Sequence, residues 1–157
     1  MTGGRDNHSS DRPGGYIVLA FDFGARRIGV ATGNAYTRTA SPLQTLVASG
    51  DAVPWNDVDR LVADWRPTQL VVGMPGEHSS IRPRVRAFAA ELEARYGLPV
   101  GTVDEARTSE AARSEIAAAR RSGVEQRRSR KGDIDKLAAC LIAEQWMSEQ
   151  ANGKDST

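Results

Sequence analysis

Residues 17–32 read IVLAFDFGARRIGVAT, an apolar run whose first half contains one acidic residue, Asp22. Strand alternation over residues 16–23 places Val18, Ala20 and Asp22 on one face and apolar side chains on the other. Both faces are therefore apolar, which is typical of a central strand covered on both sides. Because removing an unpaired carboxylate from water is costly, Asp22 needs a partner that balances its charge.

The remaining pattern predicts an α/β fold with a central mixed five-stranded sheet flanked by helices. Gly24 allows a tight turn into a second strand, so the leading strands can pair antiparallel, and later strands alternate with amphipathic helices. We expect strands over residues 16–23, 28–32, 40–47, 70–74 and 99–103, and helices over residues 54–65, 84–96, 108–121 and 133–149.

Length and composition indicate one globular domain over residues 16–150, with disordered tails at residues 1–15 and 151–157. The net charge is only +1, from 21 Lys and Arg against 20 Asp and Glu, so any nucleic-acid surface must be a local patch. The single cysteine, Cys140, excludes a disulfide framework and fits a core position. The sequence contains no apolar run long enough to cross a membrane and no signal peptide at its start, and we expect a cytoplasmic protein.

Three carboxylates are candidates for one site. Asp22 ends the first strand and Glu105, beside Asp104, follows the last, and the ends of parallel strands meet at one edge of a sheet. In the final helix, at about 100° per residue, Asp135 lies roughly 70° from the apolar stripe and Asp133 about 130° from it. Asp135 is therefore expected to face the sheet. Clustered carboxylates with open positions suit Mg²⁺ or Mn²⁺, which promote phosphodiester hydrolysis.

Basic residues adjoin each element of the proposed site, as a phosphate-binding rim requires. Two follow Asp22, three (Arg82, Arg84 and Arg86) follow the loop after Gly73, and a cluster precedes Asp135. An alternative is that they form only solvated, arginine-rich loops. The candidates for nucleic-acid binding are Arg26, Arg27, Arg84, Arg127, Arg128, Arg130 and Lys131.

Four stretches resemble the YqgF/RuvX family: AFDFGARRIGVATG at 20–33, VVGMP at 71–75, VDEARTSEAA at 103–112 and KGDIDKLAACLIAEQW at 131–146. The resemblance implies an RNase H-like fold with an acidic triad at Asp22, Glu105 and Asp135, and it places Arg26 at the family's basic position. Where the family continues with arginine after the last strand, this chain has Ala106 with Arg107 next to it. Arg107 is therefore a further candidate for substrate binding.

The resemblance also implies activity. Members are described as Holliday junction resolvases and as nucleases that mature the 5′ end of pre-16S ribosomal RNA. We therefore expect a metal-dependent nuclease, using Mg²⁺ or Mn²⁺, whose partner is pre-rRNA. Branched DNA is the alternative substrate, and a non-catalytic nucleic-acid-binding factor in ribosome biogenesis is the alternative function. An ATPase of the actin and sugar-kinase type shares the first hairpin but needs two lobes. We expect a monomer or a weak homodimer.

Overall fold

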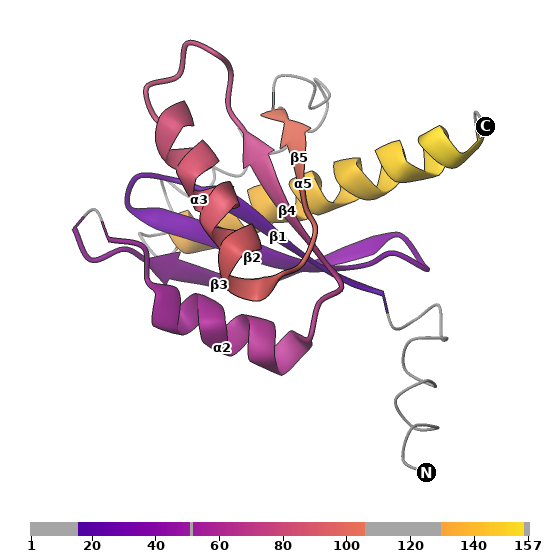
Figure 1. Cartoon of the computed structure of the whole chain (residues 1–157), viewed down its shortest axis with the longest axis horizontal. Coiled ribbons are helices and arrows are strands. Elements are labelled where there is room, and N and C mark those ends of the chain that lie inside the picture. Colours follow the sequence, from indigo (N-terminus) through magenta and orange to yellow (C-terminus); the bar gives the residue numbers. More distant parts are fainter. Residues whose placement is uncertain (1–15, 51, 106–129, 156–157) are drawn as a thin grey trace.

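The computed structural model describes residues 16–50, 52–105 and 130–155, and among these the side chains of all but residues 130–133 and 152–155. Its five strands form one mixed sheet in the order β3-β2-β1-β4-β5 (Figure 1). The strands are β1 (Ile17–Phe23), β2 (Arg27–Asn34), β3 (Thr39–Val47), β4 (Gln69–Met74) and β5 (Val100–Asp104). The predicted mixed five-stranded sheet is confirmed.

Strand directions set the position of the candidate site. The pairs β1–β2 and β2–β3 are antiparallel, and the backbone N–H of Gly24 donates to the carbonyl of Arg27 at 2.9 Å to close the first hairpin. By contrast, β1 pairs parallel with β4, and β4 pairs parallel with β5. The carboxyl ends of β1, β4 and β5 therefore meet at one edge of the sheet, where open α/β sheets place their sites.

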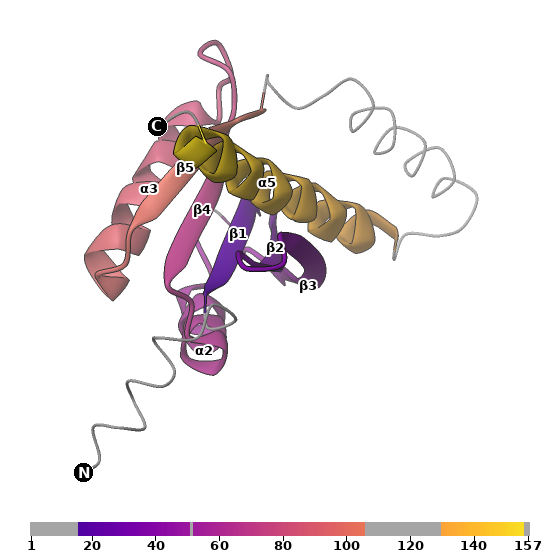
Figure 2. The same cartoon turned by 90° about the vertical axis from the view of Figure 1, so that its right-hand side faces the viewer.

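Helices cover both faces of the sheet, as the apolar character of both faces of β1 predicted. Leu19 and Phe21 face the helices α2 (Trp55–Trp65) and α3 (Arg82–Tyr96). Val18 and Ala20 face the last helix, α5 (Arg130–Asp155), which crosses the sheet on its other side (Figure 2). Phe21 is fully buried, and burying one such ring contributes about 2 kcal/mol to folding.

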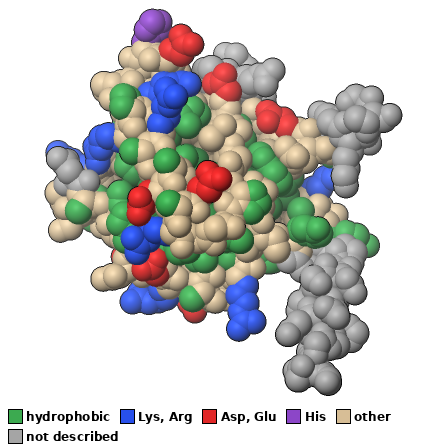
Figure 3. Space-filling view, viewed as in Figure 1, with side chains coloured by type: hydrophobic (Ala, Val, Ile, Leu, Met, Phe, Trp, Pro, Cys, Tyr) green, Lys and Arg blue, Asp and Glu red, His purple; other side chains and the backbone are tan. Residues whose placement is uncertain are grey.

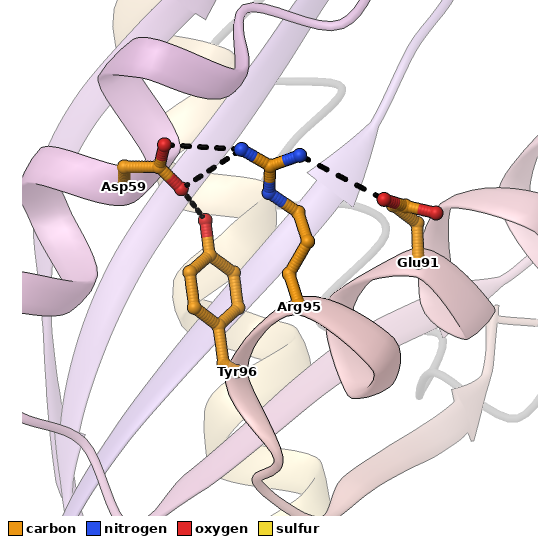
Figure 4. Close-up of polar contacts among 4 residues, drawn as sticks. All are labelled: Asp59, Glu91, Arg95 and Tyr96. Carbon is orange, nitrogen blue, oxygen red and sulfur yellow. Dashed lines mark hydrogen bonds and ion pairs between the residues drawn. The ribbon is translucent and has the colours of Figure 1, made fainter.

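A polar cluster fastens α2 to α3 (Figure 4). Arg95 pairs with Asp59 at 3.1 Å, and the hydroxyl of Tyr96 donates to the same carboxylate. The guanidinium of Arg95 also lies 4.7 Å from the centre of the Trp55 ring. The hydrogen bond from Tyr96 and then that from Arg95 lower the pKa of Asp59, while partial burial and then the bond to Asp59 raise the pKa of Tyr96 to about 12.

The last helix is longer than the sequence pattern indicated. It begins at Arg130 rather than at residue 133, so Arg130 and Lys131 belong to its first turn instead of to a loop. It also continues through residues 151–155, which we had expected in a disordered tail. Buried Ala151 follows Met147 by four residues, so the apolar stripe that packs on the sheet extends one turn further than predicted.

Two further predictions lie outside the described residues: the tail at residues 1–15 and the helix at 108–121. Among the helices that the structure describes, none is both long enough and apolar enough to span a bilayer.

Candidate functional site

Asp22 occupies the carboxyl end of β1 on the face that α5 covers. It is half-buried rather than enclosed, which lowers the cost of its charge. Across the hairpin it pairs with Gly29 of β2. On its other side lies Gly73 of β4, one step beyond the paired residues Phe21 and Val72. Asp22 therefore lies between two glycines on the neighbouring strands.

Gly29 allows α5 to approach the sheet at Asp135. A Cβ atom at position 29 would overlap the backbone carbonyl group of Asp135, so any side chain there would push the helix away. Glycine at this position is thus required by close packing of two backbones, rather than by an unusual dihedral angle. The result is that Asp135 lies directly over the strand residue that pairs with Asp22.

Gly73 has the same relation to Glu105 on the other side of Asp22. A Cβ atom there would lie 3.0 Å from Oε2 of Glu105 and 2.5 Å from Cδ1 of Ile142 in α5. Since Gly73 pairs with Val103 of β5, the chain reaches Glu105 just beyond the end of that strand. The carboxylate of Glu105 consequently lies over the strand next to β1.

The structure thus brings the three predicted acidic residues to one face and one edge of the sheet. It does not join them into a finished metal site. Among residues 16–50, 52–105 and 134–151, no three His, Cys, Asp or Glu side chains are grouped closely enough to hold a metal ion. The donor set still fits a hard divalent cation, because all three candidates offer carboxylate oxygens. Metal binding by Asp22, Glu105 and Asp135 stays a prediction.

The carboxylate of Asp135 forms an ion pair with Arg27. The Nε atom of Arg27 donates to Oδ2 of Asp135 at 2.7 Å, and the side chains are 37% and 23% exposed. The sequence pattern predicts Arg27 at the nucleic-acid surface and does not predict this pair with Asp135. Strand alternation contained a signal for it, since Arg27 precedes Gly29 by two residues and so shares the face that α5 covers.

The other basic candidates divide into four groups. Arg26 is exposed in the turn after β1, next to the site. Arg84 lies on the opposite face, with its guanidinium 5.5 Å from the ring centre of Phe23, so it borders the site edge from the α3 side. Arg130 and Lys131 lie in the first turn of α5, and their side chains are not described; Arg107, Arg127 and Arg128 are outside the described residues.

Comparison with known proteins agrees with this architecture. A profile of the RuvX family, described as Holliday junction resolvase, matches residues 16–149. A Xylella fastidiosa (strain M12) protein named "Putative pre-16S rRNA nuclease" is 43% identical over 145 residues, covering 90% of this chain and 92% of the relative. An Actinobacillus succinogenes protein of the same name is 37% identical, over 88% of this chain and 99% of the relative.

Solved structures show the same fold at much lower identity. The fowlpox virus resolvase, solved in complex with Holliday junction DNA, superposes with a TM-score of 0.53 at 14% identity, covering 85% of this chain and 98% of that chain. The predicted RNase H-like fold is thereby confirmed. With the sequence matches extending over nearly the whole described domain, the chain belongs to the RuvX family.

Proposed function

We propose that this protein is a metal-dependent nuclease that hydrolyses phosphodiester bonds in the 5′-end maturation of pre-16S ribosomal RNA. Relatives that bear the name of this activity match about nine-tenths of the chain. The observation that carries the proposal is the placement of Glu105 and Asp135 over the two glycines that flank Asp22. Three acidic residues gathered on one face of the sheet, at the edge where parallel strands end, fit phosphodiester chemistry better than a structural role.

In this proposal Asp22, Glu105 and Asp135 hold Mg²⁺ or Mn²⁺. Such a cation supplies Lewis acidity at a phosphate and lowers the pKa of water. The protein's own contribution is to fix the ligands. Asp22 is held by its pairing with Gly29 of β2, and Asp135 is held by the close packing of α5 on the same glycine. Ligands on strands and helices are positioned more accurately than ligands on loops.

Basic residues near this edge would hold the substrate backbone. Arg26 is exposed in the turn that directly follows β1, and α5 begins with Arg130 and Lys131. The positive end of a helix dipole at that N-terminus also favours a phosphate. On the face that carries α3, Lys and Arg side chains are interspersed with Asp and Glu side chains (Figure 3). Because the net charge of the whole chain is only +1, substrate attraction depends on local contacts and not on the field of the whole protein.

The test compares wild type with Asp22→Asn on a 16S precursor RNA with a 5′ extension, with and without Mn²⁺. Asp57→Asn is the matched control, because Asp57 is an exposed carboxylate on α2, in the opposite layer. We expect Mn²⁺-dependent cleavage by wild type and by Asp57→Asn, and at least a hundredfold loss in Asp22→Asn. Equal cleavage by wild type and Asp22→Asn would contradict the proposal.

A four-way DNA junction is the second substrate in the same experiment, because the family's description names Holliday junctions. Cleavage of the junction in preference to the RNA would show that the substrate of this site is branched DNA. Binding of both substrates without cleavage of either would instead indicate a non-catalytic nucleic-acid-binding factor.

A further inference from the structure

The ion pair between Arg27 and Asp135 joins the first hairpin to the last helix, 108 residues later in the chain. Neither side chain is enclosed: 37% of Arg27 and 23% of Asp135 are exposed. Both groups are thus open to exchange with solutes, unlike a pair that is sealed in the core. The pair lies on the face and at the edge where Asp22 and Glu105 are found.

A guanidinium and a divalent cation require the same thing of Asp135, namely the negative charge of its carboxylate. The single positive charge of Arg27 balances that carboxylate at 2.7 Å. A second, divalent cation at the same oxygens would be repelled by the guanidinium and deprived of part of its ligand charge.

We infer that Arg27 competes with the divalent cation for Asp135, holding this carboxylate in the metal-free protein and yielding it when the cation binds. Arg27 is then a positioning residue, and its displaced guanidinium is available at the site edge for a substrate phosphate. A guanidinium carries five N–H donors in a planar fork that suits phosphate as well as carboxylate. The inference deepens the proposed function and depends on Asp135 being a metal ligand there.

The alternative is that Arg27 has only a structural role. Metal ligands are often oriented by hydrogen bonds from residues that do not touch the metal. If Arg27 only fixed Asp135 and the start of α5 in this way, its removal would make the ligand more mobile and would weaken metal binding. Competition predicts the opposite sign, because removing the guanidinium frees the carboxylate and removes a repelling charge. The direction of the change in metal affinity therefore separates the two roles.

The experiment measures the dissociation constant of Mn²⁺ by titration calorimetry, without substrate, for wild type, Arg27→Gln and Arg27→Lys. Arg60→Gln is the charge-matched control, because Arg60 makes only a weak surface pair with Asp57 on the opposite layer. We expect Mn²⁺ to bind Arg27→Gln about three- to fivefold more tightly, the upper part of the range set by the strength of exposed ion pairs. Arg27→Lys, which keeps the charge, and Arg60→Gln should stay within about twofold of wild type. Thermal unfolding of each variant shows whether it is folded.

A double-mutant cycle with Asp135→Asn completes the test, since the effect of Arg27→Gln should vanish when the carboxylate is absent. Weaker or unchanged Mn²⁺ binding in Arg27→Gln, with loss of affinity in Asp135→Asn, would overturn the competition and leave the proposed metal site intact. Unchanged Mn²⁺ affinity in both Arg27→Gln and Asp135→Asn would show that Asp135 is not a metal ligand. That result would overturn the competition and also the proposed role of Asp135 in the metal site. Cleavage assays on Asp22→Asn report separately on the proposed activity.

Discussion

The Nε atom of Arg27 lies 2.7 Å from Oδ2 of Asp135, so a strand residue of the first hairpin holds an acidic residue near the start of the last helix. Two residues further along β2, Gly29 lets the backbone of the same helix rest on the strand. Together these two contacts fix the beginning of α5 at the edge where β1, β4 and β5 end. The position of Asp135 beside Asp22 is thus a property of the packing between α5 and β2.

The packing at Gly29 predicts a large cost for a single methyl group. In Gly29→Ala the new Cβ atom meets the backbone carbonyl of Asp135, and a backbone cannot move aside as the end of a side chain can. We expect the free energy of unfolding to fall by about 3 kcal/mol, at the upper end of overpacking costs. Urea unfolding followed by circular dichroism measures it as a lower midpoint.

Gly76→Ala is the matched control, since an added Cβ atom there has no neighbour within 4 Å. This variant should be as stable as wild type or up to about 1 kcal/mol more stable, because alanine restricts the unfolded chain. Equal midpoints for Gly29→Ala and Gly76→Ala would show that α5 does not rest on β2 in this way.

The α2–α3 cluster predicts a loss of stability at alkaline pH. The pKa of Tyr96 is raised to about 12, first by burial and second by its hydrogen bond to Asp59, whereas a tyrosine in an unfolded chain titrates near 10. The folded state holds this proton more tightly, so the contribution is complete below about pH 10 and is lost as the pH rises through about 12. The hydroxyl group of Tyr96 is partly exposed to solvent, which weakens this effect. We therefore expect its contribution to the free energy of unfolding to be about 1 kcal/mol.

Urea unfolding of wild type and Tyr96→Phe between pH 8 and pH 12 checks this prediction. Wild type should be the more stable protein at pH 8, and the difference should shrink as the pH rises, because phenylalanine has no proton to lose. A difference that stays constant over this range would show that Tyr96 is not held in its protonated form by the fold.

Cys140 should be chemically inert in the folded protein. Its side chain is buried in α5 against the sheet, and burial, followed by the charge of Glu144, raises the pKa of its thiol to about 11. Two pKa units above the ordinary value reduce the reactive thiolate about a hundredfold at pH 8. Reaction with a thiol reagent such as DTNB should therefore be at least that much slower in buffer than in 6 M guanidinium chloride. Comparable rates in the two solvents would contradict the buried placement.

Much of the site could be predicted from local patterns. Strand alternation placed Asp22 on the face of Val18 and Ala20, and those residues do pack against α5. The rule that parallel strands end at one edge indicated Glu105, and the helical wheel favoured Asp135 over Asp133. Each of these inferences used only the geometry of a single element or the direction of a strand, which the sequence specifies through its spacing of apolar residues.

The parts that were missed depend on how elements pack against one another. The sequence pattern gave no account of Gly29 or Gly73, because their importance arises from a helix and a strand far away in the chain. The Arg27–Asp135 pair could not be predicted for the same reason. Arg84 was a nucleic-acid-binding candidate because it follows the loop after Gly73, and the sequence did not show that its side chain lies against Phe23 on the opposite face of the sheet. The length of α5 was underestimated because Ala151 is a small residue in an otherwise polar stretch.

The central claim is that Asp22, Glu105 and Asp135 form one divalent-cation site. Anomalous diffraction from crystals of the protein soaked in Mn²⁺ tests it most directly, because it locates the ion without relying on activity. We predict an anomalous peak between β1 and α5 with carboxylate oxygens of Asp22 and Asp135 about 2.1 Å away, as expected for a small, hard divalent ion, and with Glu105 on its other side. A Mn²⁺ peak elsewhere on the protein, with Asp135 still paired to Arg27 at saturating Mn²⁺, would contradict the account.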